Sequence, residues 1–486
     1  MESPTQELAE FAANLSYQDI PAHVVHQAER LILDTCGCAV AGYILDNAKT
    51  FLHVMEALGG NPEATLFPSG HKTSVATAAF VNTSLSNALD LDDNLLYHCH
   101  FANTTVLPAV AMAERQGCSG RDLVTAVVAA YEVTSRITLS QPGVCKIVSP
   151  PPNLKIEQPP LATHNYNVFS AAVGAGRLLG LDATRMACAM GMAGLNAPVP
   201  RTAGHGGPGG APTMKGTNYG WQGWTGVIAA LLAEQGVTGP TTVLDGESGF
   251  WRMSGAESCN SAMLTKDLGS KWWILDTSFK AYPAGTWMRP AMEATDKVVR
   301  THDIRPDEIE RIVIKNGRLV GGYIRNPWAE DGPVNEVVGQ TNFLYLVVMR
   351  ALRVPPARWH TKETYTNPVV LDLLKKIEFV RDPSHELALY QELMQQEKTQ
   401  GVRRATKSPT TVEVHARGTV FSAYAEYARG DPFSEETRMR DEDLAAKFRT
   451  HTVGIVRSSR AERAIQALLS VSKVADVRTV TPLLTA

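Results

Sequence analysis

The stretch Ile309-Glu-Arg-Ile-Val-Ile-Lys-Asn-Gly317 decides the fold class, because a strand pattern here interrupts a chain that is otherwise helical. Apolar and polar residues alternate along it and it stops at a glycine, as in a half-buried β-strand that ends in a turn. Further on, Thr411-Val-Glu-Val-His-Ala-Arg-Gly418, followed by Thr419-Val-Phe-Ser-Ala-Tyr, predicts a β-hairpin. The apolar run at residues 343–352 lies between them and predicts a helix. Together these segments indicate a small α+β unit.

The first 270 residues instead predict one helix after another. Ser119 with Asp122 forms a capping box that starts a helix, and Asp182 caps another. The segment Phe169-Ser-Ala-Ala-Val-Gly-Ala-Gly176 is built from small residues, which let helix axes approach closely. Three-and-four spacing of apolar residues marks a further helix, at Val25, Ala28, Ile32, Cys36 and Ala39. We therefore expect a compact, multilayer helical domain.

We predict a mainly α fold with a large all-helical domain and a smaller α+β lid. Residues 1–276 form the first part of the helical domain and residues 277–432 form the lid. Helical periodicity returns at residues 442–450 and 460–471, so residues 433–486 are predicted to rejoin the helical domain. The polar segment at residues 382–404 is weakly patterned, and no element is predicted for it.

The composition excludes several classes of protein. The chain has 486 residues, 44% of them hydrophobic and 20% charged, with a net charge of −3, so nothing favours nucleic acid as a partner. No apolar stretch is long enough to span a bilayer, and seven scattered cysteines do not form a disulfide framework. The N-terminus lacks the order of a secretory signal. We expect a cytoplasmic protein; mitochondria are the alternative, although there is no clear transit peptide.

The densest group of chemically active residues is Asp90-Leu-Asp-Asp-Asn-Leu-Leu-Tyr-His-Cys-His100. Three carboxylates and two imidazoles in eleven residues suggest proton transfer or a metal site, and a polar inter-helix loop is the equally weighted alternative. His98 and His100 with Asp92 and Asp93 could ligate a divalent metal, but no remote fourth ligand can be named, so we predict no metal.

The sequence supports neither a dinucleotide-binding loop nor an iron–sulfur cluster. Gly204-His-Gly-Gly-Pro-Gly209 matches the spacing of a dinucleotide-binding loop, yet it neither follows a strand nor opens a helix. The cysteines form no group of three that could hold an iron–sulfur cluster. We therefore expect no cofactor.

Several segments, in shared order and spacing along nearly the whole chain, resemble the MmgE/PrpD family, whose members include 2-methylcitrate dehydratase and cis-aconitate decarboxylase. The resemblance rests on the following segments: Arg30-Leu-Ile-Leu-Asp-Thr-Cys-Gly-Cys-Ala-Val-Ala-Gly42, Ala88-Leu-Asp-Leu-Asp-Asp93, His100, Thr104-Thr-Val-Leu-Pro-Ala109, Thr163-His-Asn, Met214-Lys-Gly, Phe279-Lys-Ala-Tyr-Pro283, Tyr323-Ile-Arg-Asn-Pro327 and Val338-Gly-Gln. It implies the same helical domain with an α+β lid, a small polycarboxylate as substrate, and a homodimer.

The family's active-site residues, carried over position by position, fall on Asp90, Asn94, His100, His164, Lys215, Lys280 and Tyr323. Lys215 and Lys280 would clamp substrate carboxylates, and closure of the lid would bring in the charge of Lys280. His100 and His164 would act as base and acid, with Asp90 orienting one of them, while Asn94 and Tyr323 would bind substrate. Without the family, a solvated surface charge explains each lysine better than a clamp does, and a hydrogen-bonded packing residue explains each histidine equally well.

The function that we predict is a cofactor-independent lyase that dehydrates 2-methylcitrate or another alkylcitrate to an aconitate-type product. Trp221, Trp224 and Trp287 could line a sub-pocket for the alkyl group. The alternatives are decarboxylation of a cis-aconitate-type acid, and isomerisation or epimerisation of a related dicarboxylate. Asn94 departs from a threonine frequent in the family, and Gly285 from a histidine or cysteine. These departures motivate a non-enzyme alternative, a catalytically silent homologue that binds a metabolite.

Overall fold

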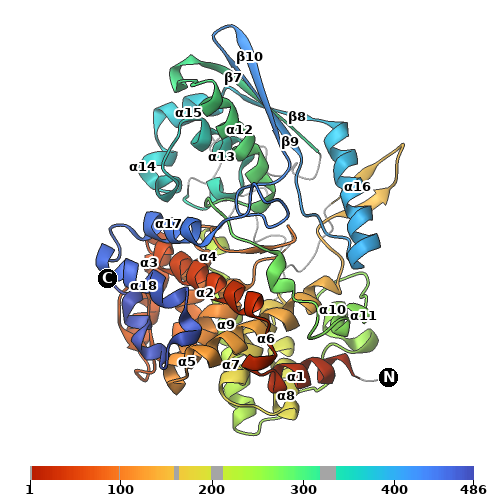
Figure 1. Cartoon of the computed structure of the whole chain (residues 1–486), viewed down its shortest axis with the longest axis vertical. Coiled ribbons are helices and arrows are strands. Elements are labelled where there is room, and N and C mark those ends of the chain that lie inside the picture. The colour runs from red at the N-terminus through yellow and green to blue at the C-terminus, as the bar shows by residue number, and fades with distance from the viewer. Residues whose placement is uncertain (1–2, 98, 158–163, 199–211, 318–334) are drawn as a thin grey trace.

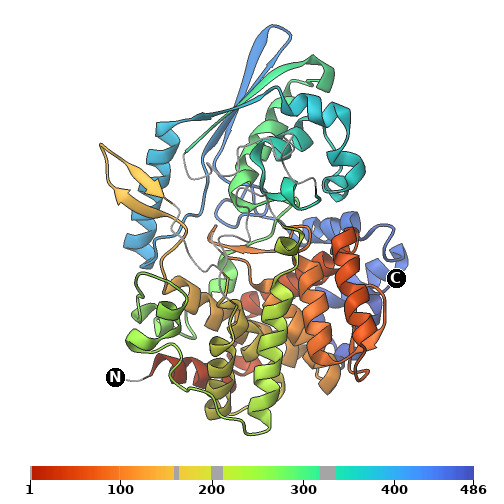
Figure 2. The same cartoon turned by 180° about the vertical axis from the view of Figure 1, so that it is seen from behind.

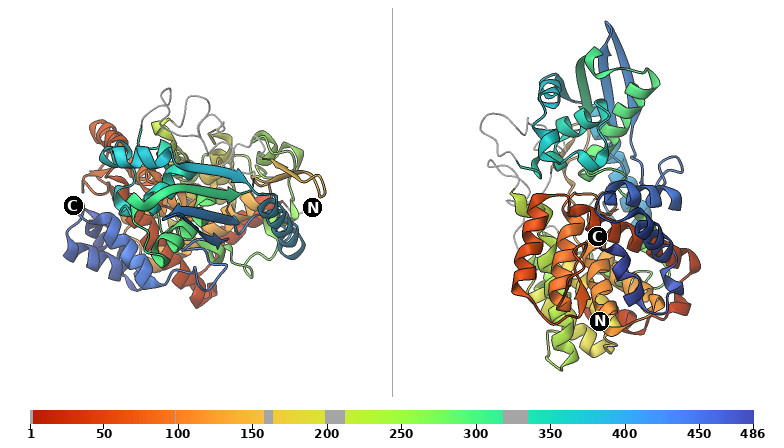
Figure 3. Two further views of the ribbon diagram at one scale, coloured as in Figure 1. Left: turned by 90° about the horizontal axis from the view of Figure 1, so that it is seen from above. Right: turned by 90° about the vertical axis from the view of Figure 1, so that its left-hand side faces the viewer.

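The computed structural model describes residues 3–97, 99–157, 164–198, 212–317 and 335–486. A helical part and a smaller part that contains a β-sheet lie one above the other (Figure 1 and the right panel of Figure 3). The mainly α fold with a smaller α+β unit is therefore confirmed. The boundaries predicted at residues 276 and 432 stay a prediction.

Helices that pack closely through small residues form the larger part. A Cβ atom on Gly226 of α9 would lie 2.5 Å from the Ala171 side chain of α7, and one on Gly220 would lie 2.5 Å from the Phe80 carbonyl of α4. Only glycine allows these helices so near, as the composition predicted. The helices of this part are α1 (Pro4–Asn14), α2 (Ala22–Gly42), α3 (Asp46–Leu58), α4 (Val75–Asn87), α5 (Ala102–Gln116), α6 (Gly120–Leu139), α7 (Asn167–Leu178), α8 (Ala183–Leu195), α9 (Tyr219–Glu234), α10 (Phe250–Met253) and α11 (Ala262–Thr265).

The smaller part contains a four-stranded sheet in the order β10-β9-β7-β8, seen from above in the left panel of Figure 3. Strand β7 (Ile309–Asn316) pairs in parallel with β8 (Ile377–Arg381) and antiparallel with β9 (Thr410–Ala416), which forms the predicted hairpin with β10 (Thr419–Ala425). Every second residue of β9 is buried, so the sheet buries one face. The helices of this part are α12 (Arg289–Thr301), α13 (Phe343–Ala351), α14 (Lys362–Tyr365) and α15 (Pro368–Leu374), and α12 packs on β9 and β10.

The C-terminal helices return to the helical part, as their periodicity predicted. Helix α17 (Asp441–Thr452) and helix α18 (Ser458–Leu468) pack on α2. The contact is close, because a Cβ atom on Gly37 of α2 would lie 2.7 Å from the Phe448 ring of α17. This return brings α17 beside the loop that follows α4.

Several helices of the smaller part were not predicted individually, namely α12, α14, α15 and the longest of them, α16. Helix α16 (Pro383–Gln400) follows β8 in the chain. It lies beside the hairpin of β4 (Lys146–Ser149) and β5 (Lys155–Glu157), as Figures 1 and 2 both show. It buries Leu389 and Leu393 against this hairpin and leaves most of its surface polar. Such a narrow apolar stripe gives little periodic signal, which explains why the sequence pattern missed it.

Within the described ranges, no single helix has the length and hydropathy needed to cross a membrane. Helices α2 and α3 meet those criteria only as a pair, and the chain bends by 92° between them.

Candidate active site

The loop between α4 and α5 carries the predicted acids and lies where the two parts meet. Its short strand β3 (Asn94–Leu95) pairs antiparallel with β6 (Thr277–Ser278), the strand that leads into Lys280. This pairing brings Lys280 to Asp90 across 190 positions of sequence. Asp90 itself has a left-handed backbone with φ 53°, a conformation that is uncommon for residues other than glycine and concentrates at functional sites.

Asp90 holds the two predicted lysines. Lys215, in the 3-10 turn η3 (Thr213–Gly216), donates to Asp90 Oδ2 at 2.8 Å. Lys280 donates to Asp90 Oδ1 and, at 3.0 Å, to the Asp90 carbonyl oxygen. Burial alone would raise the pKa of the Asp90 carboxyl, but the ammonium groups of Lys215 and Lys280 outweigh burial and hold this pKa well below its usual range. The site thus contains two buried cations that share Asp90 as a fixed counter-ion.

The two ammonium groups differ in how many donors they have left. Among the described residues, Lys215 Nζ uses one of its three N–H groups, whereas Lys280 Nζ uses two on Asp90. Lys280 is 0% exposed and Lys215 is 7% exposed. We therefore interpret Lys215 as the cation with more capacity for a new anion, and Lys280 as the one that also fixes Asp90.

Asp90, Lys215 and Lys280 are called the ion cluster below. The two predicted imidazoles lie together beside it. The ring centroids of His100 and His164 are 5.6 Å apart. His100 Nδ1 donates to the Asp93 carbonyl oxygen at 2.6 Å, so in the neutral ring Nε2 carries no hydrogen and is an acceptor. Burial, and then the charge of Lys280, lower the pKa of His100 to about 3, so the ring is neutral at pH 7. His164 precedes α7 with a φ of 72°, also in the left-handed region.

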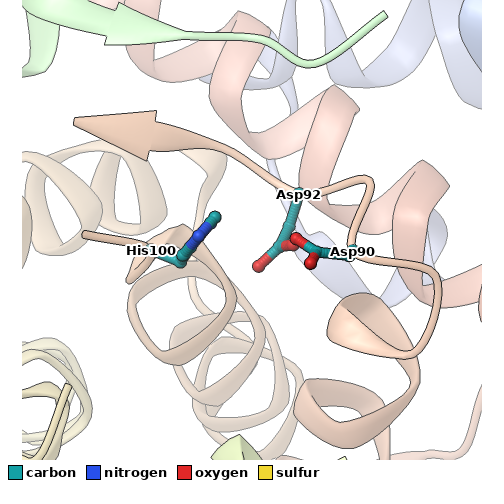
Figure 4. Close-up of side chains that lie close together, drawn as sticks. All are labelled: Asp90, Asp92 and His100. Atoms are coloured by element: carbon teal, nitrogen blue, oxygen red, sulfur yellow. The ribbon is translucent and has the colours of Figure 1, made fainter. Parts of the chain in front are cut away.

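Asp90, Asp92 and His100 form a group that could in principle hold a metal ion (Figure 4). One ligand atom from each of the three lies within 4.8 Å of the others. Asp92 accepts from the side-chain amides of Asn87 and Asn103, and burial raises its pKa to about 6. A divalent cation would displace or repel the ammonium groups on Asp90, and Lys280 Nζ also lies 3.9 Å from Asp92. The donor set therefore fits the two lysines better than a metal.

Two residues that the sequence did not single out support the loop. Gln340 donates to the Ala88 carbonyl oxygen at 2.7 Å, and Lys447 of α17 donates to the Leu91 carbonyl oxygen at 2.9 Å and to Asp34 at 2.6 Å. Gln340 lies in the Val338-Gly-Gln segment, which was a signal without an assigned role. Nothing local marks Lys447, because its partners are remote in sequence. Contacts from both parts therefore fix the loop.

The structure brings together Asp90, His100, His164, Lys215 and Lys280. Asn94 donates to the Cys99 carbonyl oxygen at 3.3 Å, and its Oδ1 has no partner among the described residues, so its role in substrate binding stays a prediction. Tyr323 lies outside the described residues. At Gly285 a Cβ atom would lie 3.1 Å from Met288 Sδ and 3.3 Å from the Thr341 side chain. A larger residue at this position would therefore require these two side chains to shift.

The expected tryptophan sub-pocket does not match the placement of two of its members. Trp221 and Trp224 are 48% and 40% exposed on α9, where they cannot enclose a buried alkyl group within this chain. Trp287 packs edge-on against Tyr97 at 5.4 Å. The interpretation of these residues as a shared sub-pocket is therefore wrong for Trp221 and Trp224.

Comparison with known proteins finds similarity along nearly the whole chain. The family model described as the MmgE/PrpD N-terminal domain matches residues 6–259, and the one described as the MmgE/PrpD C-terminal domain matches residues 282–473. The cis-aconitate decarboxylase of Aspergillus terreus is 25% identical over 99% of this chain and 95% of its own length. The human cis-aconitate decarboxylase is 26% identical over 79% of this chain and 78% of its own length. The cis-aconitate decarboxylase-like protein oryM of Aspergillus oryzae is 24% identical over 70% and 72%.

Proposed function

The chain belongs to the MmgE/PrpD family, and from this premise we propose that it is a lyase that decarboxylates a cis-aconitate-type polycarboxylate. The names of the relatives support this choice over dehydration, because each of the three compared above is called a cis-aconitate decarboxylase or decarboxylase-like protein. The observation that carries the proposal is the buried pair of ammonium groups beside two imidazoles.

Decarboxylation needs what this cluster offers. The bond between the leaving carboxylate and its carbon breaks, carbon dioxide departs, and the electron pair stays on a carbanion conjugated with the remaining carboxylates. Fixed cations such as Lys215 and Lys280 stabilise that negative charge in a site shielded from water. A proton must then reach the carbanion, and an imidazole is suited to deliver it. The bound polyanion would raise the pKa of His100 and so favour the protonated ring.

The proposal is tested by incubating the purified protein with cis-aconitate. We expect release of carbon dioxide and, in equal amount, a five-carbon unsaturated dicarboxylate seen by mass spectrometry. An active cis-aconitate decarboxylase assayed in parallel serves as the positive control. Decarboxylation is wrong if cis-aconitate is returned unchanged while 2-methylcitrate or citrate gains the absorbance of a conjugated alkene.

Dehydration of 2-methylcitrate or another alkylcitrate is the second candidate. The closeness of His100 and His164 favours it, because dehydration requires one group that removes a proton and another that protonates the leaving hydroxide. Exchange of substrate hydrogen with deuterated water, without net conversion, would instead indicate an isomerase or epimerase. Stabilisation against heating by polycarboxylates, with no turnover of any of them, would indicate a silent binding homologue.

Removing metal ions is expected to leave the activity unchanged. Asp90, the acid that a metal would need, is already paired with Lys215 and Lys280. Extended dialysis against EDTA should therefore change the turnover of cis-aconitate by less than about twofold, since a loss of only ~0.4 kcal/mol in transition-state stabilisation would give that factor. A loss that added divalent cation restores would contradict this expectation.

We also propose that the protein is a homodimer that uses the outer face of α9, which runs along the face seen in Figure 2. Trp221 and Trp224 are exposed and lie three residues apart, and exposed Leu232 follows eight residues after Trp224. Large aromatic residues are enriched at protein interfaces. Light scattering after size exclusion should give twice the chain mass, and Trp224→Glu should lower the mass to that of one chain. A monomeric wild-type protein would contradict the proposal.

A further inference from the structure

His360 is a third buried imidazole near the ion cluster, and it comes from the smaller part of the molecule. It lies between the 3-10 turn η10 (Pro356–Arg358) and α14, and it is 2% exposed. Its Nε2 contacts the Pro283 carbonyl oxygen at 2.7 Å. Because a carbonyl oxygen only accepts, Nε2 must donate. The neutral ring then presents Nδ1 as a bare acceptor, and Nδ1 has no hydrogen-bond partner among the described residues.

The backbone contact places this ring beside the active site. Pro283 follows Lys280 by three residues, and the next residue, Ala284, donates its N–H to the Asp90 carbonyl oxygen at 3.2 Å. The charged groups that act on the ring are Asp90 and Lys215, and the aromatic ring of Tyr345 lies 6.2 Å away. Burial lowers the pKa of His360 to about 4, so the ring is neutral before an anion binds.

Another buried histidine, His451, resembles His360 but lies away from Asp90 and Lys215. His451 of α17 also has one nitrogen on a backbone carbonyl, that of Lys447 at 3.0 Å, and its Nε2 has no partner among the described residues. Burial lowers its pKa to about 4 as well. However, the charge that acts on it is Lys447, and neither Asp90 nor Lys215 does. His451 is therefore a matched buried histidine outside the ion cluster.

We propose that His360 binds a carboxylate of the substrate through Nδ1, so that the substrate is held from both parts of the molecule. This inference rests on the proposed polycarboxylate substrate, and it adds a binding residue that the family resemblance did not supply. A buried acceptor without a donor costs free energy, and a bound anion relieves that cost when the ring takes up a proton and donates to a carboxylate. The proton comes from solvent, so binding consumes protons from the buffer.

The sign of the pH dependence follows from this uptake. Each ring has a low pKa in the free protein. A bound anion would raise that pKa, because it favours the charged form of the ring. Between those two values the complex holds more protons than the free protein, so binding tightens as the pH falls. The limit is about tenfold in Kd per pH unit for each proton taken up, since one pKa unit corresponds to ~1.4 kcal/mol. His100 and His360 contribute separately.

The test uses tricarballylate, a tricarboxylate that lacks both the alkene and the hydroxyl group, and titration calorimetry in two buffers of different ionisation enthalpy. In His360→Gln the longer amide can keep a donor on the Pro283 carbonyl oxygen while the titrating Nδ1 is lost. We expect this variant to bind about tenfold more weakly at pH 6, where a charge-assisted hydrogen bond is lost, and to take up fewer protons than wild type. His451→Gln should match wild type in both respects.

A second variant separates binding from support of the Pro283 turn. His360→Asn places an amide near Nδ1 and loses the Pro283 contact, so a purely structural role predicts that it binds more weakly than His360→Gln. The inference is overturned if it does so, or if His360→Gln binds with the affinity and proton uptake of wild type. If wild type binds tricarballylate through His360 but does not convert cis-aconitate, the proposed decarboxylation fails while this inference stands. If wild type does not bind tricarballylate, the inference fails whatever the turnover.

Discussion

Replacing Lys215 with methionine is expected to lower kcat/KM for the polycarboxylate by a factor on the order of 10²–10³, the loss typical when a charge-stabilising donor is removed from an active site. Lys215 is the buried ammonium with more unused donors among the described residues. The fold should survive, because Asp90 keeps its contacts with Lys280. The measurement is steady-state kinetics together with a thermal melt.

Lys72→Met is the control for this prediction. Lys72 also donates to a buried carboxylate, Glu114, at 2.6 Å, but it lies outside the ion cluster. We expect this variant to retain the activity of wild type within about twofold, a change of only ~0.4 kcal/mol. A loss below about tenfold in Lys215→Met, equivalent to ~1.4 kcal/mol, would show that this ammonium does not clamp the substrate.

Replacing His100 with asparagine is expected to lower kcat by a factor on the order of 10²–10⁴, the usual contribution of general acid–base catalysis. The asparagine amide can take the place of Nδ1 and donate to the Asp93 carbonyl oxygen, so the loop keeps its hydrogen bond. What is lost is Nε2, the atom that can carry a proton to or from the substrate. When kcat is measured across pH 5–9, the pH dependence that the ionisation of His100 gives to wild type should be absent from the variant.

His451→Asn controls for the removal of a buried histidine. Nδ1 of His451 also contacts a backbone carbonyl oxygen, and burial lowers the pKa of His451 as it does that of His100. We expect full activity from this variant. If His100→Asn keeps more than about a tenth of the wild-type kcat, a loss of less than ~1.4 kcal/mol, His100 packs the loop and does not transfer protons.

The fold could be predicted from sequence where each element carries its own periodic signal. The strand β7, the hairpin of β9 and β10, and the capping box at Ser119 are all found in the structure. The expected alternation along β7 is not, because Ile312, Val313 and Ile314 are buried in succession. Helix α16 was missed because it buries a narrow stripe on a polar surface. The return of α17 to α2 was indicated by periodicity, but its closeness depends on Gly37 meeting Phe448, which no local pattern shows.

The candidate site was predictable only in part. The acids and histidines of residues 90–100 are dense in the sequence, and the family resemblance added Lys215, Lys280 and His164. The sequence did not show that one carboxylate, Asp90, would pair with both lysines, because that depends on β3 meeting β6. His360 carries no local motif and reaches the site only through the Pro283 turn.

The most direct measurement is a structure of the protein with bound tricarballylate. The account predicts that one carboxylate lies within hydrogen-bond distance, about 3 Å, of Lys215 Nζ, and that another lies within the same distance of His100 or His360. Lys280 should still contact Asp90. Tricarballylate bound away from these side chains would contradict the central claim that this cluster holds a polycarboxylate.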